Sequence, residues 1–349
     1  MRPERHLHGR RHPVGNRPHP LDELVRMIRS APDDALPLCR IPPRLAVPLM
    51  MRDSTSRPTR RRITGSAGML GIVLGRSRLL QSDRVQWERA LVTGASAGIG
   101  RAMAVRLADA GVDLVLVARR GDRLEELAED LRADGAGPEV EVLEADLCDL
   151  DGLAAVEKRV VAEDAPIDLL VNNAGLGYEG PFHSQDPIEV SETINVNMVA
   201  LVRLSHAALG SMTARDRGQV ILVSSMASLQ GMPMTALYAA TKAFITSFGE
   251  GLYEEHKGTG VTVTTVLPGL TRTEFHQRGR WNLDKWPSVG WQSAEEVAAE
   301  ALAAAARSRP EMVTGRINRV LAVLSGVSPR RIRRTLIGRA ARRAWPEGL

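Results

Sequence analysis

Residues 93–100 read Thr-Gly-Ala-Ser-Ala-Gly-Ile-Gly and stand between a short apolar run, residues 90–92, and an amphipathic helical pattern that begins at Ile99. The three glycines of this stretch allow the backbone to turn tightly and to approach a pyrophosphate closely. The N-terminus of the following helix offers free N–H groups and the positive end of the helix dipole. The order of strand, glycine loop and helix therefore predicts the first βα unit of a dinucleotide-binding domain rather than a plain glycine-rich turn.

Downstream of this loop, short apolar runs alternate with amphipathic helical patterns. The expected strands are residues 89–93, 112–117, 139–143, 167–171, 219–224, 261–267 and 311–314. The expected helices are residues 98–110, 121–134, 150–163, 187–213, 235–256 and 293–307, the last with Ser293 as N-cap and Glu296 completing a capping box. This alternation predicts βαβ units, and right-handed crossovers then give a doubly wound parallel sheet with helices on both faces.

A tyrosine and a lysine stand four residues apart in the run Tyr238-Ala-Ala-Thr-Lys242, inside one of the expected helices. Positions i and i+4 share a helix face, so we expect the ammonium of Lys242 beside the phenol of Tyr238. A nearby positive charge favours phenolate and is expected to lower the pKa of the tyrosine from about 10 toward neutral pH. Ser225 follows an apolar strand, at the edge where an open α/β sheet places its chemistry. Taken alone, Tyr-x-x-x-Lys also fits any helix with a solvated lysine. The glycine loop upstream favours the catalytic interpretation.

Further motifs follow one another along the chain. They are Asn-Asn-Ala-Gly at 172–175, Asn-Val-Asn-Met at 195–198, Val-Ser-Ser at 223–225, Pro-Gly at 268–269 and Thr273. With these motifs, residues 88–315 resemble a short-chain dehydrogenase/reductase. The resemblance implies one Rossmann-type catalytic domain of about seven strands, and hydride transfer between a nicotinamide cofactor and a carbonyl or secondary alcohol.

The resemblance also implies four catalytic residues. Tyr238 gives a proton to the substrate oxygen or removes it, and Ser225 hydrogen-bonds that oxygen and orients it. Lys242 lowers the pKa of the tyrosine and binds the ribose beside the nicotinamide. Asn197, rather than its neighbour Asn195, holds a water that links Lys242 to solvent as a proton relay.

Cofactor contacts are implied in the same way. Asp146 and Leu147 are expected at the adenine, Asn172 and Gly175 at the adenosine ribose, and Thr273 at the nicotinamide or phosphate end. The implied cofactor-binding set is Thr93, Gly94, Ser96, Gly98, Ile99, Gly100, Arg119, Asp146, Leu147, Asn173, Ala174, Gly175, Tyr238, Lys242, Pro268, Gly269 and Thr273.

The tip of the second expected strand bears on the choice of cofactor. An acidic residue about 20 positions beyond the glycine loop holds the ribose 2′-OH of NAD, whereas an arginine accommodates the 2′-phosphate of NADP. Arg119 stands 19 residues after Gly100 and no Asp or Glu occupies the tip, which predicts NADP(H) over NAD(H). The alternative is a surface pair, Arg119 and Arg120, neutralised by the nearby Asp122 and Glu125.

The charge of the chain is divided unevenly. The net charge of +5 is made of about +10 over residues 1–89, −13 over residues 90–315 and +8 over residues 316–349. The expected catalytic region is therefore acidic and would repel phosphate backbones, so no nucleic-acid partner is expected. The two cysteines form neither a disulfide framework nor a metal-ligand cluster, no metal is expected, and a cytoplasmic setting fits.

The two ends of the chain differ from the middle. Residues 1–87 are a Pro- and Arg-rich extension, expected to be disordered, with a helical spacing at residues 21–28 and an alternative start at Met69. Residues 316–349 are expected to be a basic amphipathic tail. Its last apolar stretch, residues 332–344, fits either peripheral contact with an anionic membrane surface or a helix docked on its own domain.

The substrate and the assembly are less closely defined. Residues 270–292 correspond to the family's substrate lid, and Trp281, Trp286 and Trp291 either line an apolar pocket there or pack the lid onto the body. Tyr178 and His183 are further candidates for the pocket wall. A hydrophobic ketone or an acyl thioester suits such a site.

The resemblance implies a homodimer through the helices at 187–213 and 235–256, or a homotetramer. Two rival functions remain open, a non-catalytic dinucleotide-binding module and an interaction protein that acts through its tail. All four catalytic positions are filled, which favours the enzyme.

Overall fold

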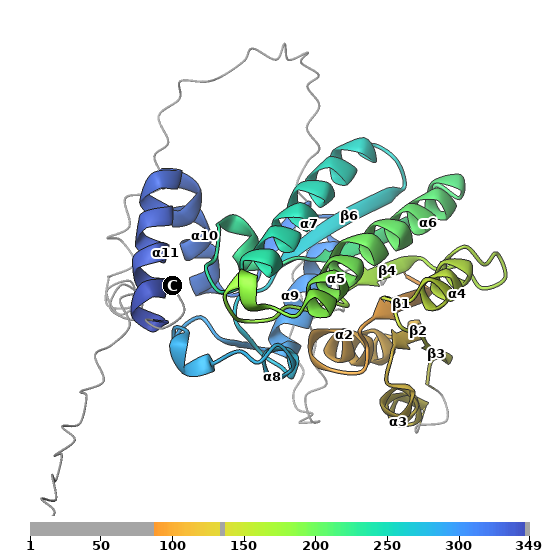
Figure 1. The fold of residues 1–349 in the computed structure, drawn as a ribbon. Helices are drawn as coiled ribbons and strands as arrows, with labels where there is room; N and C mark the ends of the chain where they lie inside the picture. The colour runs from red at the N-terminus through yellow and green to blue at the C-terminus, as the bar shows by residue number, and fades with distance from the viewer. Residues whose placement is uncertain (1–86, 133–136, 346–349) are drawn as a thin grey trace, which may run out of the picture.

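The computed structural model describes residues 87–132 and 137–345; the expected N-terminal helix at 21–28 and Met69 lie outside these ranges. Within them the chain folds into a seven-stranded sheet in the order β3-β2-β1-β4-β5-β6-β9, flanked by helices on both faces (Figure 1). Every pairing in this sheet is parallel. The doubly wound sheet predicted from the alternating pattern is confirmed.

The strands lie where the apolar runs predict them, with ends shifted by at most two residues. They are β1 Arg89–Thr93, β2 Asp113–Ala118, β3 Val140–Glu144, β4 Leu169–Asn172, β5 Gly218–Val223, β6 Val261–Leu267 and β9 Glu311–Val313. A separate two-stranded ribbon pairs β7 Thr271–Arg272 with β8 Gln292–Ser293. The central strands are covered by helices on both faces, which is why their sequences are continuous apolar runs rather than alternating ones.

The helices follow the predicted amphipathic segments, including the C-terminal stretch 332–344, and add two that were not predicted, at residues 275–278 and 316–327. They are α2 Gly98–Asp109, α3 Gly121–Arg132, α4 Leu150–Val160, α5 Pro187–Ile194, α6 Leu201–Ala214, α7 Ala236–Glu255, α8 Phe275–Arg278, α9 Ala294–Ala306, α10 Arg316–Val327 and α11 Arg330–Ala344. Short 3₁₀ turns are η1 Phe182–Ser184, η3 Met226–Leu229 and η4 Leu283–Lys285. The predicted capping box is present at α9, because Ser293 Oγ accepts from the Glu296 N–H at 3.2 Å and Glu296 Oε2 accepts from the Ser293 N–H at 2.9 Å.

The single helix predicted over residues 187–213 changes its winding in the middle. Between α5 and α6, the segment η2 Asn195–Ala200 is a π-helix. A π-turn widens the helix by one residue and is frequent at functional sites. Here it carries the candidate catalytic Asn197, and amphipathic spacing alone did not indicate the change of winding.

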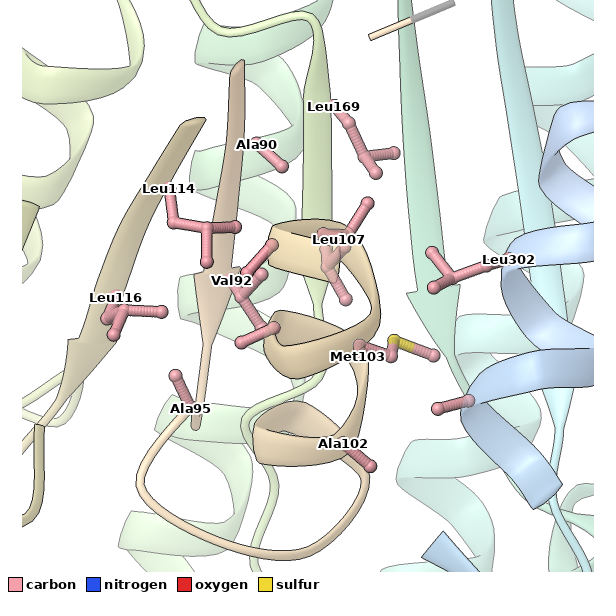
Figure 2. Close-up of a cluster of buried hydrophobic side chains, with 14 of the residues drawn as sticks. Ala90, Val92, Ala95, Ala102, Met103, Leu107, Leu114, Leu116, Leu169 and Leu302 are labelled. Carbon is pink, nitrogen blue, oxygen red and sulfur yellow. The ribbon is translucent and has the colours of Figure 1, made fainter. Parts of the chain in front are cut away.

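Two apolar cores hold the sheet between its helical layers. Alternate residues of one strand face opposite cores, so Val92 of β1 packs on the side of α2 and α9 while Leu91 packs on the side of α4 and α6. Figure 2 shows Met103 and Leu107 of α2 in one cluster with Val92 and with Leu302 of α9. Each fully buried leucine of this kind contributes about 1.5–3 kcal/mol of transfer free energy. Two packed faces fix the strands and therefore the loops at their carboxyl ends.

The C-terminal helices α10 and α11 lie together beside the lid segment that contains α8 and η4 (Figure 1). α10 packs against η3, the turn that follows β5. Within the described ranges, no helix is both long and apolar enough to cross a membrane.

Candidate active site

A cavity of about 1130 Å³ opens at the carboxyl ends of the parallel strands. Most of the residues predicted for the site line it: Gly94, Ser96, Gly98, Ile99, Arg119, Asp146, Leu147, Asn173, Ala174, Gly175, Ser225, Tyr238, Lys242, Pro268, Gly269 and Thr273. Thr93, Gly100 and Asn197 lie behind this wall and support it. Residues spread over some 180 positions of sequence thus meet in one cavity, as expected at the edge of a doubly wound sheet.

The glycine loop has the backbone shape that a pyrophosphate requires. Gly94 and Gly98 adopt positive φ angles of 68° and 56°, a region that favours glycine. A Cβ at Gly100 would lie 2.4 Å from Asn173 Nδ2 and 2.5 Å from the Gly94 carbonyl oxygen, so a side chain there is excluded. The first turn of α2 has no side-chain cap and no acidic residue, which leaves its N–H groups available to an anion. The loop therefore fits the pyrophosphate of a dinucleotide.

Thr93 and Asn173 tie the glycine loop to the loop after β4. Thr93 Oγ1 accepts from the N–H groups of Asn173 and Ala174, both at 3.0 Å, and Asn173 Nδ2 donates to the Thr93 carbonyl at 2.9 Å. Asn172, expected at the adenosine ribose, is instead buried and donates to Ser205 Oγ at 3.0 Å. This expectation was wrong because alternate residues of a strand face opposite sides, and Asn172 is the last residue of β4.

The arginine pair after β2 lines the cavity, and its partners differ from those of the alternative interpretation. Arg119 lines the cavity and approaches Asp146 at 3.7 Å. Arg120 also lines it, and its Nη2 donates to Ser96 Oγ at 2.9 Å while its Nη1 donates to Glu274 Oε2 at 2.9 Å. Arg120 was treated in the sequence as part of a surface pair and not as a site residue. The partners of the pair are Asp146 and Glu274, and not the Asp122 and Glu125 of the alternative interpretation. Both arginines line the part of the cavity beside the glycine loop, which is called the cofactor half below.

The tyrosine, serine and lysine of the candidate catalytic cluster meet where α7 passes the end of β5. Tyr238 is buried, and the Ser225 hydroxyl lies close enough to its phenol to favour the phenolate. Ser225 caps η3 by accepting from the Ala227 N–H at 3.1 Å. Lys242 is buried too; its Nζ donates to the Val223 carbonyl at 2.8 Å and lies 5.7 Å from the centroid of the Tyr238 ring. The i, i+4 spacing does bring the lysine and the tyrosine to one face of the helix.

Burial, rather than the lysine, dominates the protonation of this cluster. It raises the pKa of Tyr238 to about 12, partly opposed by the nearby Ser225 hydroxyl, and it lowers the pKa of Lys242 to about 8. The expectation that Lys242 lowers the pKa of Tyr238 is thus not met in the protein alone. Removing a phenol from water disfavours its anion, and Lys242 directs its ammonium at a carbonyl instead of the phenol oxygen. At pH 7 the tyrosine is a neutral acid and the lysine is mostly charged.

Asn197 is fully buried and binds two segments of the site together. Its Oδ1 accepts from the Leu176 N–H at 2.8 Å, and its Nδ2 donates to the Leu176 carbonyl at 2.7 Å and to Thr241 Oγ1 at 3.0 Å. A Cβ at Gly175 would lie 3.4 Å from both Asn197 Oδ1 and Lys242 Nζ, which shows how near the amide is to the lysine. The widened π-turn directs this amide inward, so Asn197 positions the loop beside Lys242.

A chain of aromatic rings covers the catalytic cluster. The Tyr238 ring lies 5.4 Å from Phe275 and 5.6 Å from Trp281, and Trp281 stacks on Trp286 at 4.9 Å. Trp281 Nε1 donates to the Gly177 carbonyl at 2.9 Å, which joins the lid to the loop after β4. Trp281 and Trp286 line the cavity, as the first interpretation of the lid tryptophans predicts. Trp281 also fastens the lid to the body through Gly177, as the second predicts. Trp291 is not among the lining residues.

The two other candidates for the pocket wall have different outcomes. Tyr178 lines the cavity, and its hydroxyl donates to Glu192 at 3.3 Å. His183 lies in η1, is exposed and does not line the cavity, so its assignment to the wall was wrong. The turn after Pro181 carries it to the surface.

The C-terminal helix α11 forms a wall of the same cavity. Its lining residues recur every three or four positions and so share one face: Arg333, Leu336, Ile337, Ala340, Ala341 and Ala344. Glu179 fastens the end of this helix, because its carboxylate accepts from Trp286 Nε1 at 2.8 Å and from Trp345 Nε1 at 3.0 Å. The inner face of the basic tail is therefore docked on its own protein. The three-to-four spacing was visible in the sequence, but the partner of that face was not.

A doubly wound parallel sheet with a glycine loop for a dinucleotide, and a buried serine, tyrosine and lysine beside it, defines the class of nucleotide-dependent oxidoreductases. Residues 88–283 match the short chain dehydrogenase family. The chain belongs to this family and is an NAD(P)-dependent enzyme of it.

Relatives and solved structures extend the comparison. The chain is 30% identical to a very-long-chain 3-oxoacyl-CoA reductase of Anas platyrhynchos over 232 residues, which cover 64% of this chain and 73% of the relative. A solved short-chain dehydrogenase from Sphingobium yanoikuyae in complex with NADPH is 36% identical, with a TM-score of 0.62 over 72% of this chain and 95% of that one. The bulky-bulky ketone specific alcohol dehydrogenase from Comamonas testosteroni is 31% identical, with a TM-score of 0.59 over 70% and 94%.

Proposed function

We propose that the protein reduces a large apolar carbonyl compound with NADPH, or oxidises the matching secondary alcohol, and that Tyr238 moves the proton. The observation that carries the proposal is the placement of Ser225, Tyr238 and Lys242 in the wall of one cavity, next to the glycine loop. The nicotinamide cofactor, when bound, supplies or accepts the hydride. The side chains of the cluster supply the rest.

The protonation of the cluster suits reduction near neutral pH. Tyr238 is a neutral phenol, so it can give its proton to a carbonyl oxygen as negative charge develops there. The Ser225 hydroxyl lies beside the same phenol, so it can hydrogen-bond the carbonyl oxygen and hold it within reach of Tyr238. The charged ammonium of Lys242, over the tyrosine ring, stabilises the phenolate left behind. Asn197 is assigned the last part of the proton relay, in which it holds a water between Lys242 and solvent.

NADPH is favoured by the two guanidinium groups at the tip of β2. Arg119 and Arg120 both line the cofactor half of the cavity, and Ser96 of the glycine loop is already hydrogen-bonded to Arg120. A ribose 2′-phosphate placed there meets two cations and a hydroxyl, and within the described residues of this tip no carboxylate takes the place that binds a 2′-OH. Asp146, Leu147, Asn173 and Gly175 are assigned to the adenosine half.

The walls of the substrate half favour a large apolar molecule. Phe275, Trp281 and Trp286 of the lid line the same cavity as Leu336 and Ile337 of α11. One relative is named for bulky ketones and another for a very-long-chain 3-oxoacyl-CoA, and both names describe large substrates. A hydrophobic ketone and an acyl thioester are therefore the two substrate types to test.

The test is a screen of purified protein for NADPH oxidation with aryl ketones, long-chain ketones, 3-oxoacyl thioesters and small ketones such as acetone. Turnover is expected with large apolar carbonyls, with kcat/KM at least 10-fold above that for acetone, because a few buried methylene groups each contribute about 0.8 kcal/mol. NADH in place of NADPH is expected to be at least 10-fold less effective. Tight NADPH binding without turnover on any carbonyl would instead support a non-catalytic dinucleotide-binding module.

The outer face of α10 and α11 supports peripheral contact with an anionic membrane. Residues 316–345 contain nine arginines and no acidic residue. Exposed among them are Val323, Val327 and Ile332, which give an apolar strip inside the basic surface. Positive charge and protruding aliphatic side chains together are the features of an interfacial surface.

Sedimentation with phosphatidylserine vesicles is expected to retain the protein at low salt and to release it at high salt, because each arginine near the surface contributes about 1 kcal/mol that salt screens. A V327D/I332D variant is expected to bind at least 10-fold more weakly. Equal recovery with neutral phosphatidylcholine vesicles would contradict the proposal.

The expected homodimer or homotetramer stays a prediction. Ile188 and Ile194 of α5 and Val199 of η2 are exposed, which supports contact through the helices named for it. Analytical ultracentrifugation would contradict it by finding a monomer at micromolar concentration.

A further inference from the structure

One arginine of the cavity wall has no anionic partner among the described residues. Arg333 of α11 lines the cavity and is half-buried. Its Nη1 donates to the Leu229 carbonyl at 2.9 Å and to Ser325 Oγ at 3.0 Å, and both of these acceptors are neutral. Its Nε is enclosed by protein without a hydrogen-bond partner. The guanidinium is therefore held in a fixed orientation while its charge is uncompensated.

An uncompensated cation in an apolar wall is unfavourable unless a ligand supplies the counter-charge. Partial removal of a guanidinium from water weakens its hydration, and neutral acceptors restore only part of that loss. Most arginines of the described chain that are similarly buried face a carboxylate, as Arg120 faces Glu274 at 2.9 Å. Arg333 faces the cavity instead, with Gln230 and Ser328 as further polar lining residues. One fixed guanidinium among neutral hydrogen-bonding groups matches one carboxylate.

The position of Arg333 sets how far such a carboxylate lies from the reacting carbonyl. The residue is anchored to Leu229 at the end of η3, and Ser225 caps the start of the same turn. Four residues of a 3₁₀ helix rise about 8 Å, so the anion and the carbonyl are separated by several carbon atoms. Leu336 and Ile337, which follow Arg333 on the same face of α11, offer an apolar surface to the carbon skeleton.

We propose that Arg333 is the anion-binding residue of the substrate site and that the protein acts on apolar keto or hydroxy acids whose carboxylate lies several carbons from the reacting carbon. Arg333 donates to the carboxylate oxygens through Nη2, while Leu229 and Ser325 keep the guanidinium in place. This inference rests on the proposed function. It narrows the substrate class from large apolar carbonyl compounds to those that carry a carboxylate several carbons from the carbonyl.

Binding can be measured without turnover, because Trp281, Trp286 and Trp345 line the same cavity and report on its occupancy by fluorescence. The probes are dodecanoate and dodecanol, which differ in charge at one end. Wild-type protein is expected to bind dodecanoate more tightly. Arg333→Met is expected to weaken dodecanoate roughly 10- to 100-fold and to leave dodecanol unchanged, the usual range for a hydrogen bond to a charged group.

Two further measurements separate an anion site from a structural role of Arg333. Arg334→Met removes the same charge from the exposed side of α11 and is expected to bind both probes as the wild type does. If Arg333→Met weakened both probes equally, Arg333 would only dock α11 on η3; if wild type bound both probes equally, the anion site would not exist. Turnover of a long-chain keto acid and its methyl ester then tests specificity: the acid is preferred in wild type and not in Arg333→Met. Failure to reduce any carbonyl would refute the proposed function while the probe binding still decides on Arg333.

Discussion

Tyr238→Phe is expected to lower kcat by about 1000-fold while leaving the dissociation constant for NADPH within about threefold of the wild-type value. The variant removes only the phenol oxygen, which lies beside the Ser225 hydroxyl. General acid–base groups contribute 100- to 10,000-fold to turnover, and phenylalanine fits the same space against Phe275 and Trp281. The ring contacts are kept, so the loss is chemical rather than structural.

The measurement is steady-state turnover on a carbonyl found in the screen, together with NADPH titration by fluorescence. Tyr253→Phe is the matched control, because Tyr253 lies on the same helix, packs against the apolar core on the side of α4 and α6 and does not line the cavity. It is expected to keep turnover within about twofold. If Tyr238→Phe retained more than a tenth of wild-type kcat, another group would have to donate the proton, and the assigned role of Tyr238 would be lost.

Asn197→Ala is expected to lower the free energy of unfolding by about 2–4 kcal/mol and to reduce turnover by about 100-fold. The substitution leaves the Leu176 N–H and carbonyl without their partners, and each buried polar group left unpaired costs about 1–3 kcal/mol. The loop that carries Leu176 also carries Gly177, which packs against the Tyr238 ring. A shift of about 1 Å in that loop is enough to misplace the reacting groups.

Thermal unfolding measures the first effect, and a decrease in Tm of about 4–16 °C is expected for a domain of this size. Asn195→Ala is the control. Asn195 belongs to the same π-helical segment, but it is less buried, and its side chain has no hydrogen bond comparable to those of Asn197 among the described residues. Its replacement is expected to change the stability by less than about 0.5 kcal/mol. Equal losses in the two variants would mean that the π-turn, and not the amide of Asn197, holds the loop.

The parts of the site that were predictable are those with local signals. The glycine loop, the apolar strands and the Tyr-x-x-x-Lys spacing depend on residues within a few positions of one another, and each was found where expected. The resemblance then supplied the roles of residues such as Asp146 and Thr273, which no local pattern reveals. Even the capping box at Ser293 is a contact over three residues.

The features that were not predictable depend on contacts between distant segments. Arg333 and Leu229 are 104 positions apart, and Trp345 and Glu179 are 166 positions apart. An amphipathic pattern shows that a helix has an apolar face but does not name the surface that covers it, so membrane contact stood as one of two interpretations of the tail. The pKa of Tyr238 could not be predicted for the same reason. Helical spacing gives the position of Lys242, but it does not give the burial that raises the pKa of Tyr238.

The catalytic cluster ends at Lys242, whereas the lid and α11 come from residues after Gly269. The residues of the catalytic cluster therefore precede, in the sequence, the lid and the helix that line the substrate side of the cavity. A recombination event between two family members just after the Pro268-Gly269 turn would exchange the lid and α11 in one step, together with Thr273, α9 and β9, and would keep Ser225, Tyr238 and Lys242. Engineered chimeras joined at that point offer a direct route to new substrate ranges on an unchanged serine, tyrosine and lysine cluster.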